Sequence, residues 1–88
     1  MKKLVEVQEV EGEGFMALIG ERITMWCLDG FIYTGKLEGV NDSFIKLVNA
    51  AQVFETGPFT TKEWKDAQAL PNPVYIPSNA YGPFTILK

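Results

Sequence analysis

The chain contains no histidine and one cysteine, Cys27, among its 88 residues. Histidine is the usual general base near neutral pH and the commonest metal ligand, so its absence argues against most catalytic and metal sites. A single cysteine cannot form an internal disulfide and does not suggest a zinc site. We therefore expect a protein that is not an enzyme, that carries no catalytic residues, cofactor or metal, and that resides in a reducing compartment.

Long apolar runs and an excess of basic charge are also missing. No window approaches the roughly 18 apolar residues of a membrane span, and residues 1–14 lack the apolar core of a signal peptide. We therefore expect a cytoplasmic protein without a membrane partner. With 8 basic and 11 acidic residues the formal net charge is −3. Any contact with nucleic acid must then depend on a local group of residues and not on global charge.

Apolar residues make up 47% of the chain, which is typical of a globular domain. At this length the chain forms one domain, residues 1–88, with a thin core, because so small a domain hides only about 60–65% of its unfolded surface. Six Phe, three Tyr and two Trp are many for such a core, so we expect some aromatic side chains in an interface or a site. Residues 1–13 form an N-terminal extension that fits either a short strand or a frayed tail.

A short helix and the first arm of a β-hairpin are predicted next. Residues 14–20, GFMALIG, are apolar and bounded by glycines, which predicts one or two helical turns capped by Gly20. From residue 22 the apolar side chains alternate with others, as in a half-buried strand. Asp29-Gly30 follows at once and predicts a two-residue mirror-type turn, with positive φ at both central positions.

The second arm of the hairpin runs from residue 31 to about residue 40. Gly35 inside it indicates a sharp bend or a close backbone approach, and small barrels need such a bend to close. A third strand, residues 43–53, follows after a short polar tip. Ile45 and Leu47 share its buried face, and Lys46 lies on the opposite face.

The second half of the chain is irregular at first. Residues 56–73 form a long loop with three prolines, and Thr60 and Glu63 match a capping box ahead of a short helix over residues 62–68. Two last strands are predicted at residues 74–76 and 84–88. The sequence therefore predicts a mostly β domain of five strands with two short helices.

The order of these elements and the residues of the hairpin resemble the Sm and LSm (Sm-like) family. The family's first motif has alternating aliphatic residues, Asn/Asp-Gly, a tyrosine, a glycine and an aliphatic residue before an Asp-rich tip. The residues that match without gaps are Asp29, Gly30, Tyr33, Gly35 and Leu37. The resemblance covers residues 15 to about 53. It implies an SH3-type small barrel of five strongly bent antiparallel strands, in a divergent member of viral (phage) or environmental bacterial type.

Two registers against the family motif are open at the polar tip. Without a gap, Asn41 takes the place of the family's aspartate. With one residue inserted, Asp42 takes that place and Lys46 replaces the base-contacting asparagine of the family. Strand alternation favours the inserted register, because it turns Lys46 outward and keeps Ile45 in the core.

The resemblance implies that single-stranded RNA binds near the pore of a ring. The family's second motif, an aliphatic residue followed by Arg-Gly, is replaced by Ile-Pro-Ser at residues 76–78 and lacks the arginine. The candidate RNA-binding residues are Asn41, Asp42, Phe44, Lys46, Ser78 and Asn79.

Each candidate also has a plain structural interpretation. Phe44 either stacks on a base or packs against a neighbouring subunit. Lys46 either meets a phosphate or a base edge or is solvated on a strand face. The residues at 41–42 and 78–79 are good turn formers in their own right.

Assembly follows from the same resemblance. In the family the fourth strand of one subunit pairs with the fifth strand of the next, and the last two strands here carry almost no charge to protect an edge. We therefore expect a homo-oligomeric ring of five to seven subunits that binds single-stranded RNA. The alternative is an oligomeric scaffold or protein-interaction module, favoured by the acidic balance and the altered second motif. A small-molecule or catalytic barrel is a third class, and the chain lacks the reactive cluster that it needs.

Overall fold

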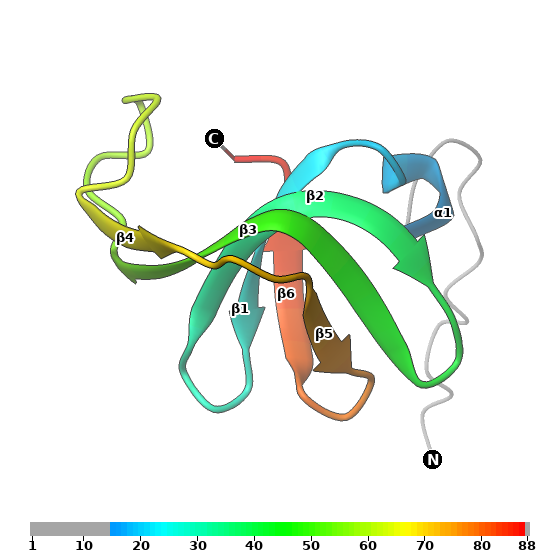
Figure 1. The fold of residues 1–88 in the computed structure, drawn as a ribbon. Coiled ribbons are helices and arrows are strands. Elements are labelled where there is room, and N and C mark those ends of the chain that lie inside the picture. Colours follow the sequence, from blue (N-terminus) through cyan, green and yellow to red (C-terminus); the bar gives the residue numbers. More distant parts are fainter. Residues whose placement is uncertain (1–14, 88) are drawn as a thin grey trace, which may run out of the picture.

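The structure, a computed structural model, describes residues 15–87, within which a short helix precedes six strands (Figure 1). The elements are α1 (Phe15–Leu18), β1 (Arg22–Cys27), β2 (Ile32–Val40), β3 (Phe44–Glu55), β4 (Asp66–Ala69), β5 (Val74–Pro77) and β6 (Tyr81–Thr85). A mostly β fold with little helix is thus confirmed. The N-terminal extension, residues 1–13, lies outside the described residues.

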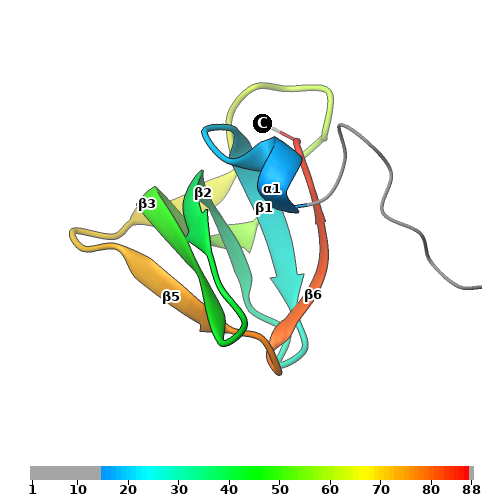
Figure 2. The same cartoon turned by 90° about the vertical axis from the view of Figure 1, so that its right-hand side faces the viewer.

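All six strands belong to one antiparallel sheet of order β4-β3-β2-β1-β6, with β5 paired to β3 beside this path. β3 makes the branch possible, because residues 44–47 pair with β5 and residues 51–55 pair with β4. The sheet curls so that β5 and β6 lie at its two margins, with β3, β2 and β1 between them (Figure 2). Among the described residues no ladder joins β6 to β4 or β5, so the sheet is curved but not closed.

The hairpin between β1 and β2 forms as predicted, but its turn is of another type. Within the turn only Gly30 has a positive φ, 93°. The Gly30 N–H donates to Cys27 O at 3.0 Å and the Cys27 N–H donates to Phe31 O at 2.8 Å. This is a three-residue loop, in which a type I turn is followed by a left-handed glycine. Asp29 has a negative φ, and its Oδ1 accepts the Phe31 N–H at 3.0 Å.

Gly35 lies at a close approach of β2 to β3. A Cβ at this position would lie 3.1 Å from the Cβ atoms of Leu47 and Ala50. The register shifts here, so that two residues of β3 oppose one of β2, and Asn49 in the bulge has a positive φ of 48°. The predicted close approach is confirmed, and the bulge bends β3.

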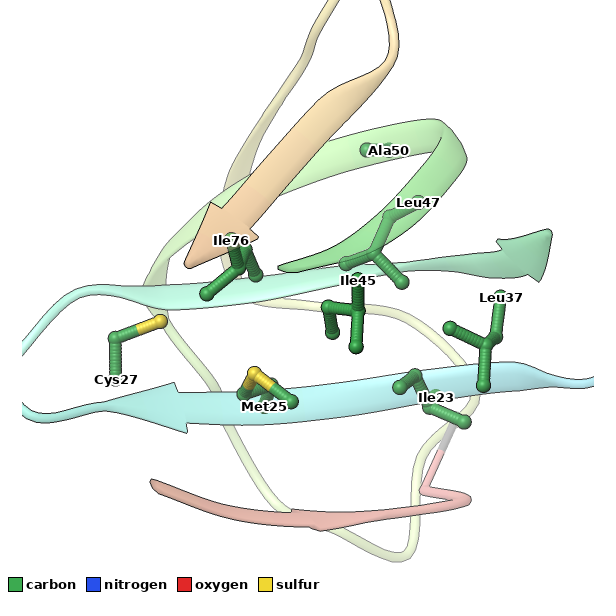
Figure 3. Close-up of a cluster of buried hydrophobic side chains, with 8 residues drawn as sticks. All are labelled: Ile23, Met25, Cys27, Leu37, Ile45, Leu47, Ala50 and Ile76. Atoms are coloured by element: carbon green, nitrogen blue, oxygen red, sulfur yellow. The ribbon is translucent and has the colours of Figure 1, made fainter. Parts of the chain in front are cut away.

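The core is formed by side chains on the inner face of the curved sheet (Figure 3). Its buried members are Ile23, Met25, Cys27, Leu37, Ile45, Leu47, Ala50 and Ile76. The predicted faces of β1 and β3 are therefore confirmed, since Ile45 and Leu47 are 0% exposed and Lys46 points outward.

The opposite face of β1 and β2 is also covered at one point. Thr24 and Thr34 are cross-strand partners and are fully buried. The Thr34 hydroxyl donates to Ile23 O at 3.0 Å and lies 3.4 Å from the Thr24 hydroxyl. Each buried polar group thus has a partner, as the cost of burying an unpaired hydroxyl requires.

The predicted helix over residues 62–68 is wrong. Residues 61–65 form no helix, and Asp66–Ala69 is the strand β4, which pairs with the second half of β3. A helix of one or two turns has too few internal hydrogen bonds to be stable alone, whereas a ladder on β3 supplies partners at once. The long loop therefore ends at residue 65, and the sheet has six strands and not five.

The helix α1 is confirmed, with its left-handed glycine, Gly20, at φ 93°. Phe15 holds it against β6, because its ring stacks on Phe84 at 4.2 Å between centroids and meets Tyr81 edge-on at 5.2 Å. The last strand begins earlier than predicted, at Tyr81, because the ladder to β1 starts opposite Cys27.

Replacing Gly35 by valine tests the close approach of β2 and β3. We expect Gly35→Val to lower the free energy of unfolding by about 1–3 kcal/mol, because Leu47 and Ala50 must move away from the new side chain. Gly39→Val in the same strand is the matched control, since a Cβ there meets nothing within 4 Å. Urea unfolding followed by tryptophan fluorescence measures both. Equal midpoints for the two variants would contradict the close approach.

Candidate functional site

The tip between β2 and β3 is shaped by the Asn41 side chain. Its Oδ1 accepts the N–H groups of Ser43 at 2.7 Å and Phe44 at 2.9 Å, and the Asn41 N–H donates to Phe44 O at 3.0 Å. This oxygen is therefore used inside the tip. Asp42 is exposed at its end.

The turn between β5 and β6 lies beside this tip. The Ser78 N–H donates to Ser43 O at 2.8 Å, and Ala80 N–H closes the turn on Pro77 O at 2.9 Å. Figures 1 and 2 show the two connections at the same end of the sheet. The structure thus brings together the two groups of candidates, residues 41–46 and 78–79, which are more than thirty positions apart in the chain.

Two aromatic rings stand on the outer face of β3 and β5. Phe44 is 36% exposed and Tyr75 is 52% exposed, and their rings meet edge-on with centroids 5.3 Å apart. Sequence reasoning missed Tyr75. The alternation of β5 carried the signal, because Ile76 in the core requires Tyr75 to face outward next to its β3 partner, Lys46.

Lys46 lies beside these rings and is paired with a carboxylate. Its Nζ is 2.7 Å from Glu38 Oε1 and 5.9 Å from the centroid of the Tyr75 ring. The hydrogen bond and charge of Glu38, followed by the charge of Tyr75, raise the pKa of Lys46. Lys46 is therefore a protonated but locally neutralised cation. Sequence reasoning also missed Glu38, which comes from β2.

We call Phe44, Tyr75, Lys46 and Glu38 the outer patch. It offers two ring surfaces for stacking, one ammonium group and one carboxylate, with the polar tips of residues 41–43 and 78–80 beside it. Proteins that bind single-stranded nucleic acid stack its unpaired bases on aromatic rings and place cationic side chains beside its phosphates. The same rings also suit an apolar side chain of a protein.

Side chains that could hold a metal ion do not gather in the described part of the chain. Within residues 15–87 no three His, Cys, Asp or Glu side chains lie close enough to hold a metal ion. Burial, followed by the charge of Asp29, raises the pKa of the Cys27 thiol. Cys27 therefore stays protonated at neutral pH and is a core residue, not a nucleophile.

Comparison with known proteins identifies no relative. No protein-family model, curated protein or solved structure matches the chain. Within the described residues no helix is long and apolar enough to cross a membrane.

Truncating Asn41 tests the internal role of this candidate. We expect Asn41→Ala to lower the free energy of unfolding by about 1–2 kcal/mol, because two backbone N–H groups lose their acceptor. Asp42→Ala, at the exposed neighbouring position, should change it by less than about 0.5 kcal/mol. Chemical denaturation of both variants gives the comparison, and an unchanged midpoint for Asn41→Ala would show that the side chain does not hold the tip.

Proposed function

We propose that this protein is an Sm-like subunit that binds single-stranded RNA through the outer patch. The observation that carries the proposal is the exposed pair of Phe44 and Tyr75 on one strand face, with Lys46 beside it. Bases stack on such rings for about 1–3 kcal/mol each in single-strand binders. Because binding by stacking needs little global charge, it is compatible with a net charge of −3.

An Sm-like barrel is the architecture that we propose for this function. It is supported by a short helix ahead of a strongly curved antiparallel sheet, by the order of the strands and by the close approach at Gly35. The tip after β2 and the turn after β5, where the family motifs fall, lie side by side. The patch would then lie near the pore of a ring.

We further propose that the ring forms through β4 and β6. The outer edge of β5 is poorly suited to pairing with another strand. Ser78 N–H donates to Ser43 O, so in the antiparallel ladder every second residue before Ser78 directs its backbone N–H and C=O groups away from β3. These outward residues are Pro73, Tyr75 and Pro77. Prolines donate no hydrogen bond, so this edge offers one N–H over five residues. The β5 edge therefore disfavours the pairing between subunits that the sequence predicted for the strand at residues 74–76.

The edges of β4 and β6 match each other better. The Leu70-to-Ala50 hydrogen bond fixes the alternation of β4, so that Ala67 and Ala69 direct their N–H and C=O groups away from β3. On β6 the pairing of Thr24 with Thr85 leaves the backbone of Phe84, and of Ile86 beyond it, facing outward. Two outward residues at the same spacing on each edge allow head-to-tail pairing, which closes a ring of five to seven subunits if the rotation permits.

A second candidate function is an oligomeric scaffold or protein-interaction module. It is favoured by apolar side chains away from the outer patch, since Phe31 is 50% exposed and Phe54 is 52% exposed. Extending the pairing of Ile32 with Val53 by one residue places these two rings on adjacent strands. Exposed apolar groups that lie near each other are typical of protein-binding surfaces. The pairing of Lys46 with Glu38 also weakens its attraction for a phosphate.

RNA binding is tested by fluorescence anisotropy with labelled oligo-U and oligo-A at low salt. We expect Phe44→Ala and Tyr75→Ala each to weaken binding by about 5- to 150-fold, the equivalent of one lost stacking contact of about 1–3 kcal/mol. Phe59→Ala is the matched control, because this ring is 56% exposed on the loop between β3 and β4. Absence of binding by the wild type would contradict the RNA proposal and favour the second candidate.

Assembly is tested by size-exclusion chromatography with light scattering. We expect a wild-type oligomer at micromolar concentration and a shift toward monomer in Ala69→Pro, which removes an outward N–H of β4 but no bond to β3. Ala69→Val keeps that N–H and should assemble like the wild type. A monomeric wild type, or equal assembly of both variants, would count against the β4 edge.

A further inference from the structure

The ion pair between Lys46 and Glu38 joins β3 to β2 beside a bulge. Leu37 pairs with Leu47 and Gly39 pairs with Lys46, so Glu38 is an extra residue between two regular pairs of the ladder. Continuing the register of Leu37 and Leu47 by one residue would also set Glu38 opposite Lys46, so the two residues are cross-strand neighbours with or without the bulge. Glu38 Oε1 lies 2.7 Å from Lys46 Nζ.

This ion pair is accessible to a competing anion. The side chain of Lys46 is 31% exposed and that of Glu38 is 50% exposed. A pair this open to water is weak, because both charges remain partly hydrated. A phosphate that approaches Tyr75 must therefore displace the Glu38 carboxylate before it contacts the Lys46 ammonium group. Because the ion pair is weak, this displacement costs little free energy.

We propose that Glu38 is a specificity-determining residue of the outer patch, which competes with RNA phosphates for Lys46. The proposal rests on the function proposed above. While Glu38 holds the ammonium, a polyanion without unpaired bases finds no free cation in the patch. A single strand gains stacking on Phe44 and Tyr75 first, and its phosphate then exchanges with the carboxylate. Glu38 thus lowers affinity for phosphate and leaves base stacking as the main basis of recognition.

The isosteric change Glu38→Gln releases Lys46 and is the direct test. We expect it to tighten binding of oligo-U by about two- to five-fold at low salt, the range of an exposed ion pair. It should also steepen the dependence of log affinity on log salt by about 0.7, the effect of one more phosphate contact on a single strand.

Glu55→Gln is the matched control for net charge. Glu55 pairs with Lys65 at 3.4 Å at the start of the loop between β3 and β4, and both side chains are exposed. It changes the net charge by the same amount as Glu38→Gln, so any general effect of charge appears in both. The double variant Glu38→Gln/Lys46→Met should lose the gain, because no ammonium remains to be released. Circular dichroism of each variant establishes that the fold is retained.

The outcomes separate this inference from the function on which it rests. If the wild type binds and Glu38→Gln and Glu55→Gln change its affinity by the same factor, the proposed role of Glu38 is wrong and the RNA-binding proposal is unaffected. Binding by Glu38→Gln that exceeds that of the wild type, with a steeper salt dependence, supports it. If neither the wild type nor Glu38→Gln binds either oligonucleotide at low salt, both proposals fail.

Discussion

The contact between β2 and β3 at Gly35 is the constraint on which the rest of the structure depends. Two backbones approach here until a Cβ would lie 3.1 Å from Leu47 and Ala50, and β3 inserts an extra residue at Asn49 to accommodate the curvature. Core side chains on either side of this point then face one another across the bend. In so small a domain the curvature is what creates an interior, because a flat single sheet without a second layer would bury neither of its faces.

The bend also divides β3 into two halves with different partners. The first half carries β5 and the second half carries β4, so one edge of the sheet is built from two short strands. The β5 part has prolines at its outward positions and presents the exposed ring of Tyr75 on its face. The β4 part has small side chains and free backbone groups. A single curved strand thus separates the outer patch from the β4 edge, the two surfaces on which the proposed RNA binding and assembly rest.

Two bulges of the sheet lie beside polar contacts. Asn49 accepts an Arg22 Nη1–H on its carbonyl oxygen at 3.0 Å, and Glu38 reaches Lys46 across the strands.

The sequence by itself determined the elements whose local pattern is strong. The alternation from residue 22 onward, the left-handed Gly30 and the small Gly35 each have a local physical reason, so the helix, the first three strands and the inner face of β3 could be predicted. The strand β4 could not, because four residues with no strand pattern of their own become a strand only when residues 51–55 of β3 supply hydrogen-bond partners. Tertiary structure likewise decided the outer patch. Tyr75 and Glu38 reach Lys46 from two different strands, and only the pairing of both strands with β3 brings a ring and a carboxylate to the same ammonium group.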